Sequence, residues 1–308
     1  MPGSWRPGSW LARSKRTSVQ SPWARASSES GPFFRELSGV IHRSRTMNRF
    51  LAALRWACVA LGVCSATCAQ AADVTVGVAA NFSAPMQRLA QAFEKATGHR
   101  VRPAVGATGA LYAQIRNGAP FQVLLSADDR TAARLEAEGL VVRDTRFVYA
   151  IGRLVLWSAD AAQVDSKGDV LRDAGRSAVA AQAPRLRLAV ANPKTAPYGA
   201  AAFQVLERLG VTARWQDHLV QGDNIAQAHQ FVATGNAAMG FVAMSQVMVD
   251  GRLAQGSAWV VPAHLHDPLR QEAVLLRRGE QEPAARALLA FLKTEEARAI
   301  IRAYGYEI

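Results

Sequence analysis

Cysteine is scarce in this chain of 308 residues, and the positions of the few cysteines limit its chemistry. Cys58, Cys64 and Cys68 are the three present, and none follows residue 68. Residues 69–308 therefore form no disulfide and offer no thiolate to a metal ion or a substrate. Their stability has to come from a buried core, and the 50% of residues that are hydrophobic can supply one.

Several catalytic and cofactor-binding motifs are also absent. The stretch GATGAL, residues 106–111, has neither the GxGxxG spacing of dinucleotide-binding proteins nor the lysine of a phosphate-binding P-loop. No HExxH or GxSxG pattern occurs, so the usual zinc-hydrolase and serine-hydrolase signatures are missing. We therefore predict a protein that is not an enzyme and has no cofactor. Hydrolysis of a test substrate would instead support an enzyme.

The net charge of +12 suggests nucleic acid or an anionic membrane as a partner, but the charge is unevenly placed. Residues 1–71 carry ten Lys or Arg and two acidic residues, whereas the remainder carries 26 basic and 22 acidic residues. The later chain shows no basic stripe interleaved with aromatic residues. We expect no nucleic-acid partner.

The N-terminal part falls into two segments. Residues 1–46 are rich in Ser, Arg, Gly and Pro without periodicity, which indicates a disordered or untranslated extension. Residues 47–71 resemble a secretory signal peptide, with two arginines, the apolar run WACVALGV and the sequence Ala69-Gln70-Ala71 before the expected cleavage site. A buried core helix is the alternative for the apolar run. This interpretation predicts a periplasmic protein whose mature chain begins near Ala72.

The mature chain alternates strands and helices. Apolar, β-branched runs predict strands at 74–80, 100–105 and 123–126, and apolar residues at helical spacing predict a helix after each. This order is typical of an α/β fold with a mainly parallel sheet. Ligands of such sheets bind beyond the carboxyl ends of the strands.

A second α/β series follows the apolar run at 147–159, which is long enough to leave one domain and enter another. The chain is expected to end in one helix over residues 282–305. We predict a lobe I from residues 73–152 and 270–308, and a lobe II from residues 153–269. Both contain mixed sheets flanked by helices, with a ligand cleft between the lobes.

Four strand-to-helix junctions carry uncharged hydrogen-bond donors. The junctions contain Asn81, Thr108, Tyr198 and Ile225 in turn, and all but Ile225 add a side-chain donor to the backbone N–H groups. Helix N-termini attract anions, so one cleft that collects all four could hold an oxyanion. The alternative is that each is an ordinary helix cap or turn.

Three charged residues near these junctions have simpler interpretations. Lys194 could touch an anion, but we favour a solvated lysine in a turn. Asp128 and Asp129 could indicate metal or acid chemistry, but we favour a cap for the helix that follows them.

Six segments, taken in order, resemble the periplasmic molybdate-binding proteins of ABC importers, and they span most of residues 73–308. The segments are VAANFSAPM, GATGALYAQI, NGAPFQVLLSAD, RLAVANPKTAPYG, LVQGDNIAQAHQFVATGNAAMGFVA and FLKTEEARAIIRAYGY. The resemblance implies the two-lobed type II periplasmic-binding-protein fold, which closes on molybdate or tungstate.

The same resemblance implies the ligand-binding residues. Asn81 and Thr108 stand where family members have Ser, or Asn at the first position, Tyr198 matches members that supply a phenol, and Ile225 matches a residue that supplies its backbone N–H. Molybdenum would be bound only as the oxyanion, through these four residues. One departure is Ala243, where some members have a Tyr that binds the anion.

The expected function is binding of molybdate, or tungstate, and its delivery to an inner-membrane ABC permease by a monomeric protein. The main alternative is a binding protein for another oxyanion such as sulfate or phosphate. A ferric-binding protein of similar fold is a further alternative, although such proteins use paired tyrosines and only one of the four junctions holds a Tyr.

Overall fold

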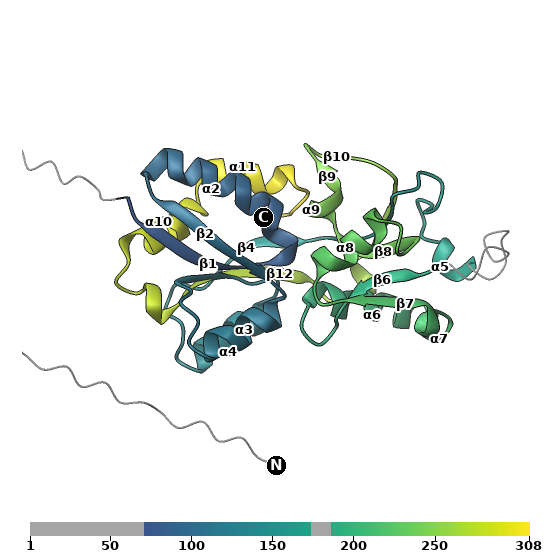
Figure 1. The fold of residues 1–308 in the computed structure, drawn as a ribbon, viewed down its shortest axis with the longest axis horizontal. Helices are drawn as coiled ribbons and strands as arrows, with labels where there is room; N and C mark the ends of the chain where they lie inside the picture. The colour runs from purple at the N-terminus through teal and green to yellow at the C-terminus, as the bar shows by residue number, and fades with distance from the viewer. Residues whose placement is uncertain (1–70, 174–185) are drawn as a thin grey trace, which may run out of the picture. The chain divides into compact units, whose positions relative to one another are not determined.

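The computed structural model describes residues 71–173 and 186–308. Within these ranges the chain forms two five-stranded sheets, each flanked by helices (Figure 1). We call the first sheet with its helices lobe I and the second sheet with its helices lobe II. The predicted extension 1–46, and all of the predicted signal peptide except Ala71, lie outside the described residues.

The sheet of lobe I has the strand order β2-β1-β3-β12-β4. Its strands are β1 (Asp73–Ala79), β2 (Arg100–Gly106), β3 (Val123–Leu125), β4 (Phe147–Gly152) and β12 (Leu269–Leu275). β1 pairs in parallel with β2 and β3, whereas β12 runs antiparallel to β3 and β4. The sheet is mixed because β12 returns from the other lobe and enters between β3 and β4.

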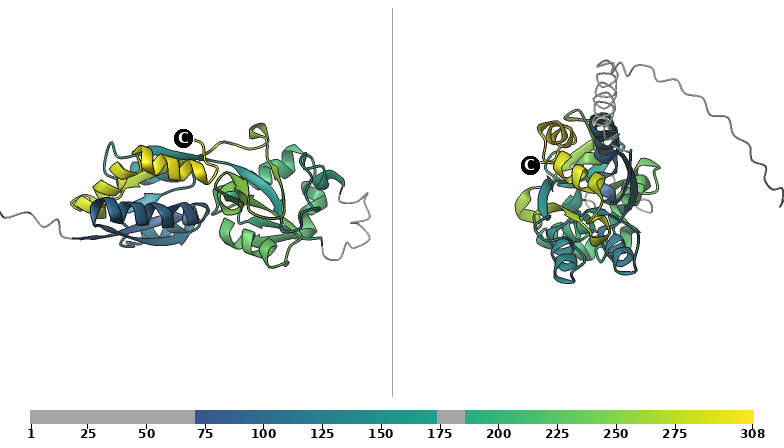
Figure 2. Two further views of the ribbon diagram at one scale, coloured as in Figure 1. Left: turned by 90° about the horizontal axis from the view of Figure 1, so that it is seen from above. Right: turned by 90° about the vertical axis from the view of Figure 1, so that its left-hand side faces the viewer.

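Helices cover both faces of this sheet (Figure 1). They are α2 (Ser83–Thr97), α10 (Pro283–Phe291) and α11 (Glu295–Ala303) on one face, and α3 (Thr108–Arg116) and α4 (Asp129–Ala137) on the other. Figure 2 shows α11 lying beside α2, which it contacts. Val123 and Leu125 pack with the first set and Leu124 with the second, as the two-residue period of a strand requires.

The sheet of lobe II has the order β11-β5-β8-β6-β7. Its strands are β5 (Leu154–Ser158), β6 (Leu188–Ala191), β7 (Leu219–Gly222), β8 (Met239–Ala243) and β11 (Ser257–Val260). Its helices are α5 (Val170–Asp173), α6 (Pro197–Arg208), α7 (Thr212–Trp215), α8 (Ile225–Ala233) and α9 (Met244–Val247). A continuous apolar cluster that includes Trp157 and Trp215 fills this lobe.

The remaining elements are short. They are η1 (Ala80–Phe82), η3 (Gln216–His218), η4 (Ala263–Leu265), η5 (Arg277–Gly279), and the hairpin of β9 (Met248–Val249) and β10 (Arg252–Leu253). The hairpin contacts lobe I, because Gly251 donates its N–H to the carbonyl of Ala303 and Asp250 lies 3.5 Å from the guanidinium of Arg88. Asp250 and Gly251 both adopt positive φ angles at this tight turn.

The run at 147–159 passes from one sheet to the other, but as two strands and not the single strand that we expected. β4 pairs with β12 in lobe I, and β5 pairs with β8 and β11 in lobe II. Arg153 separates the two strands. The chain crosses back through η4 into β12.

The prediction of one C-terminal helix over 282–305 is wrong. The segment forms α10 and α11, with Thr294 between them as the N-cap of α11. The hydroxyl of Thr294 accepts the N–H of Ala297 at 3.3 Å, and Glu295 and Glu296 lie in the first turn, where the helix dipole favours negative charge.

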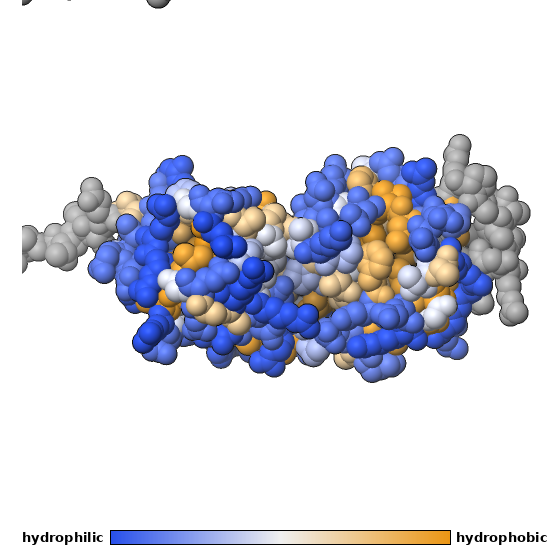
Figure 3. Space-filling view, turned by 90° about the horizontal axis from the view of Figure 1, so that it is seen from below, coloured by the Kyte–Doolittle hydropathy of each residue, from blue (hydrophilic) through white to orange (hydrophobic). Residues whose placement is uncertain are grey.

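The predicted lobe boundaries stay a prediction, and β12 begins at Leu269, one residue before the expected boundary at 270. Among residues 71–173 and 186–308, no helix has both the length and the apolar composition that crossing a bilayer requires. In Figure 3 hydrophilic residues dominate the visible face, and hydrophobic residues gather toward the end formed by lobe II.

Candidate functional site

The four predicted ligand-binding residues line one small cavity of about 10 Å³. Asn81 and Thr108 come from lobe I, and Tyr198 and Ile225 come from lobe II. The other lining residues are Ala80, Gly106, Ala107, Ala127, Ala196, Pro197 and Asn224. In the described part of the chain, no residue that lines this cavity is charged. The structure brings the four residues together, and their role as ligands stays a prediction.

Each of the four residues lies at the start of a helix that follows a strand. β1 leads into η1, β2 into α3, β6 into the loop before α6, and β7 into α8. Gly199 lets α6 approach the end of β6, because a Cβ at this position would lie 2.4 Å from the carbonyl oxygen of Ala191. Four helix N-termini, two from each lobe, therefore converge on the cavity and make it favourable for negative charge.

The N-terminus of α8 has one backbone donor left over. The side chain of Asn224 accepts the N–H groups of Ala226 and Gln227, at 2.9 and 3.1 Å, and its carbonyl accepts that of Ala228. Of the first four N–H groups of this helix, only that of Ile225 is left after these three bonds. Ile225 can therefore offer its backbone N–H to an anion, while its apolar side chain is buried.

Thr108 is the first residue of α3, and its hydroxyl has a fixed role. Its oxygen accepts the N–H of Ala127 at 3.1 Å, which leaves the hydroxyl hydrogen as a donor. The next residue, Gly109, donates its N–H to the carbonyl of Thr195 in lobe II at 2.8 Å. The two lobes thus touch beside the cavity, where the start of α3 meets the loop before α6.

Tyr198 is buried at the start of α6. Its hydroxyl oxygen accepts a hydrogen bond from Nε2 of Gln271, at 3.2 Å, and so its own hydrogen is available for another acceptor. Burial raises the pKa of the Tyr198 phenol well above its ordinary value. The group therefore stays protonated and remains a donor at neutral pH.

The expected role of the Asn81 side chain needs a correction. We predicted that its amide donates to the anion, but Nδ2 donates to Oε1 of Gln271 at 2.8 Å and to the hydroxyl of Tyr306 at 2.9 Å. Both amide hydrogens are then engaged within the protein. What remains for an anion is the backbone N–H of Asn81, in the first turn of η1. The helix α2 follows directly, with Ser83 as its first residue.

Asn81 is held by residues that carry no local sequence signal. Tyr306 donates to the carbonyl oxygen of Asn81 at 2.9 Å, and Ser245 of lobe II donates to the same oxygen at 2.7 Å. Tyr149 and Gln271, both buried, extend this group of hydrogen bonds. These partners lie up to 225 positions away in the chain, so no local pattern points to them.

A larger cavity of about 470 Å³ lies next to the small one, and it differs in character. Its lining includes the charged residues Asp128, Asp129, Arg130, Lys194, Asp267 and Arg270. The side chain of Lys194 is exposed and does not line the small cavity, in agreement with a solvated turn lysine. The convergent donors identify the small cavity as the candidate anion site, despite the greater volume of its neighbour.

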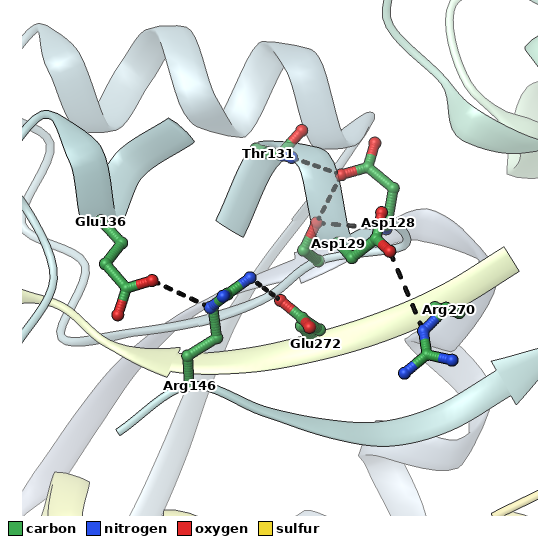
Figure 4. A network of polar contacts seen from close by, with 8 residues as sticks. Asp128, Asp129, Thr131, Glu136, Arg146, Arg270 and Glu272 are labelled. Carbon is green, nitrogen blue, oxygen red and sulfur yellow. Dashed lines mark hydrogen bonds and ion pairs between the residues drawn. The ribbon is translucent and has the colours of Figure 1, made fainter. Parts of the chain in front are cut away.

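Asp128 is the N-cap of α4, as predicted: it accepts the N–H of Thr131 at 2.8 Å. Figure 4 shows this cap and two nearby groups of ion pairs. Asp129 pairs with Arg270, and Arg146 lies between Glu136 and the buried Glu272, at 3.0 and 3.1 Å. These carboxylates are occupied by a cap and by arginines. In the described ranges, no group of three or more His, Cys, Asp or Glu is placed to hold a metal ion.

Ala243 also lies apart from the cavity lining. It ends β8, is fully buried, and donates its N–H to Oε1 of Gln246 at 2.9 Å. The position therefore contributes a structural hydrogen bond and no side-chain donor.

Two sheets, two crossings and a cavity built from helix starts define the class of protein. The family model for bacterial extracellular solute-binding proteins matches residues 74–307, and the chain belongs to this family. It has the two-lobed fold of periplasmic binding proteins.

Within this family, the chain is similar to molybdate-binding proteins. The chain is 55% identical over 249 residues to the molybdate-binding protein ModA of Azotobacter vinelandii, covering 80% of this chain and 95% of the relative. It is 48% identical over 238 residues to ModA of Rhodobacter capsulatus, covering 77% and 89%. The solved A. vinelandii periplasmic molybdate-binding protein superposes with a TM-score of 0.71 at 38% identity, over 76% of this chain and 99% of that one.

Proposed function

We propose that this protein binds molybdate outside the cytoplasm and delivers it to an ABC permease. It is a binding protein and not an enzyme, as its family and its molybdate-binding relatives indicate. The observation that carries the proposal is the uncharged cavity that Thr108, Tyr198, Ile225 and Asn81 line at four helix starts. Tungstate, which has the same charge and geometry, is the second ligand we expect.

The donor set fits a tetrahedral dianion. Hydroxyl and backbone N–H donors satisfy oxyanion oxygens and, together with the helix dipoles, offset the charge without a buried cation. A cavity that offers only donors disfavours hydrogen phosphate, whose O–H would find no acceptor there. Sulfate is smaller, so donors spaced for molybdate would hold it less well. The sulfate or phosphate alternative is therefore not favoured.

The proposal also covers the export of the protein, its oligomeric state and its partners. Ala69-Gln70-Ala71 and the run before it support export to the periplasm through a signal peptide. We propose a monomer with no cofactor and no nucleic-acid partner, which loads its anion between lobes I and II and presents it to an inner-membrane permease. Mass spectrometry of the exported protein tests the cleavage after Ala71.

Calorimetric titration of the chain from Ala72 onward tests the ligand. We expect saturable binding of molybdate and tungstate, and little or no heat with sulfate or phosphate at the same concentrations. Equal affinity for sulfate would contradict the proposed selectivity. Binding of none of the four anions would contradict the oxyanion site itself.

A matched pair of variants tests the Thr108 hydroxyl. Thr108→Ala should weaken molybdate binding by roughly 1 to 3 kcal/mol, since a charged acceptor loses one donor. Thr108→Ser keeps the hydroxyl and should stay close to the unsubstituted protein. If both variants bound equally well, the hydroxyl would not be a ligand.

A further inference from the structure

Gln271 lies at the centre of the buried hydrogen bonds behind the cavity. It belongs to β12 and is completely buried. Its Oε1 accepts from Nδ2 of Asn81 at 2.8 Å and from the Tyr149 hydroxyl at 3.0 Å, and its Nε2 donates to the Tyr198 hydroxyl at 3.2 Å. It does not line the cavity itself.

The contacts of Tyr306 determine which groups donate and which accept in these hydrogen bonds. Tyr306 lies 2.9 Å from the carbonyl oxygen of Asn81 and 3.0 Å from Oγ of Ser245. A carbonyl oxygen only accepts, so the Tyr306 hydrogen points to this side and its oxygen is left to accept from Asn81. The Asn81 amide therefore turns its Nδ2 toward Tyr306 and toward Gln271.

The orientation of Asn81 determines the orientation of the Gln271 amide, which in turn determines where the Tyr198 hydrogen points. Facing Nδ2 of Asn81, which can only donate, Gln271 presents its oxygen to this group and to the Tyr149 hydroxyl, and it turns Nε2 toward Tyr198. The Tyr198 oxygen accepts from Nε2, so the Tyr198 hydrogen must find another acceptor. The Tyr306 hydroxyl is a second neighbour of the Tyr198 hydroxyl, and its oxygen already accepts from Nδ2 of Asn81. Tyr198 itself lines the cavity that we assign to the anion.

A glycine leaves room for the hydrogen bond between Gln271 and Tyr198. Gly152, the last residue of β4, lies against it: a Cβ there would stand 2.1 Å from the Tyr198 hydroxyl and 2.7 Å from Nε2 of Gln271. Gln271 comes from lobe I and Tyr198 from lobe II, so the hydrogen bond exists only when the lobes are together.

We propose that Gln271 is a positioning residue that sets the specificity of the site. By donating to the Tyr198 oxygen when the lobes meet, it makes Tyr198 present its hydrogen, and not its lone pair, to the anion. The wall formed by Tyr198 then accepts fully deprotonated oxyanions and rejects hydrogen phosphate. This inference rests on the proposed oxyanion-binding function and assigns the source of its selectivity.

A double-mutant cycle on anion affinity tests the proposal. Gln271→Met should lower molybdate affinity about tenfold, as expected when one hydrogen bond to a charged acceptor is weakened. It should also lower the ratio of molybdate to phosphate affinity, because the freed Tyr198 oxygen can accept from hydrogen phosphate. In a Tyr198→Phe background the same change should alter molybdate affinity less than about twofold, since its effect passes through Tyr198.

Gln122→Met is the matched control. This half-buried glutamine also belongs to lobe I, and its Oε1 accepts the N–H of Thr75 at 2.9 Å, remote from the cavity residues. The control should leave both affinity and selectivity unchanged. An equal loss of affinity from Gln271→Met with and without the Tyr198 hydroxyl would overturn the proposal, and so would an unchanged selectivity ratio.

Gln271→Glu provides a second test if the methionine variant does not fold. It keeps the acceptor for Asn81 and Tyr149, and it loses the donor to Tyr198 only when it is ionised. When ionised it takes the Tyr198 hydrogen; when protonated it can donate as Gln271 does. Because burial favours the protonated carboxyl, molybdate affinity of this variant should rise as pH falls from about 8 to about 6, while the unsubstituted protein changes little. A variant whose molybdate affinity falls as the pH is lowered over this range would contradict the proposal.

Failure of the proposed function is a separate result. If the unsubstituted protein bound sulfate in place of molybdate, the assigned ligand would be wrong. The same cycle with sulfate would still decide whether Gln271 acts through Tyr198.

Discussion

The small cavity and its larger neighbour show two ways in which this protein arranges polar groups. The small cavity is lined by uncharged residues, with Asn81, Thr108 and Tyr198 buried around it. The larger cavity is lined by charged residues that pair with one another, such as Arg130 and Asp129 with Asp267 and Arg270 respectively. They differ because charge is held where water reaches it, and neutral donors are held where it does not.

This difference suggests which cavity can select a ligand. An exposed, mutually paired set of side chains holds a passing anion weakly, and salt screens it. Buried donors that are fixed by other hydrogen bonds cost little to reorganise and are stronger in a low-dielectric environment.

Gly152→Ala should have the largest effect on binding. The added Cβ would stand 2.1 Å from the Tyr198 hydroxyl, so either Tyr198 moves or the lobes meet less closely. We expect molybdate affinity to fall by about 5- to 150-fold, corresponding to the 1–3 kcal/mol typical of overpacking. Calorimetry measures the affinity, and thermal unfolding of the ligand-free variant shows whether the fold survives. Unchanged affinity would mean that Tyr198 is not held as we describe.

The buried hydrogen bonds behind the small cavity and the ion pairs of the larger cavity should affect stability at opposite ends of the pH scale. Burial raises the pKa of Tyr306 to about 12, whereas the unfolded phenol titrates near its ordinary value of 10.0. Between these values the unfolded chain loses a proton that the folded protein keeps. Stability that is fully present below about pH 10 is therefore lost as pH rises, by on the order of 2 kcal/mol at about pH 12.

At the larger cavity, stability should depend on pH in the acidic range, where Asp267 titrates. A hydrogen bond from Gln204 and the nearby Arg130 and Arg208 lower the pKa of Asp267, despite some desolvation. Its contribution to stability is present above its ordinary pKa of 3.8 and is lost as pH falls through the lowered value. Chemical denaturation at a series of pH values gives the free energy of unfolding as a curve with an acidic and an alkaline limb. Ultraviolet absorbance follows formation of the phenolate. Tyr306→Phe should flatten part of the alkaline limb, and an unaltered limb would contradict this assignment.

Lys194→Ala should have the smallest effect. The lysine is exposed at the larger cavity, so its removal should change molybdate affinity less than about twofold. Titrations at low and high salt should agree for the same reason. A large loss of affinity, or a steep salt dependence, would show that a cation holds the ligand.

Local sequence signals predicted the parts of the site that depend on short stretches of chain. Thr108 and Ile225 each follow a strand and begin a helix, so strand and helix periodicity alone placed them at sheet edges. Thr294 carried a local signal too, a Thr before two glutamates, and could have divided the predicted C-terminal helix.

Long-range contacts could not be predicted in this way. Gln271 stands just before an apolar strand segment, and nothing near it in the chain indicates that Asn81, 190 positions away, is its partner. The role of Asn81 was misjudged for that reason: its residue type predicts a donor, but only the packed lobes decide which acceptor receives the hydrogen. Polar groups that meet across two lobes depend on the tertiary fold and not on periodicity.

The most direct test of the central claim is a crystal structure of the protein grown with molybdate, with the metal located by anomalous scattering. The account predicts that the ion lies in the small cavity, within hydrogen-bonding distance of the Thr108 and Tyr198 hydroxyls and of the Ile225 and Asn81 backbone N–H groups. An ion bound instead to Lys194 or Arg130 in the larger cavity would contradict it.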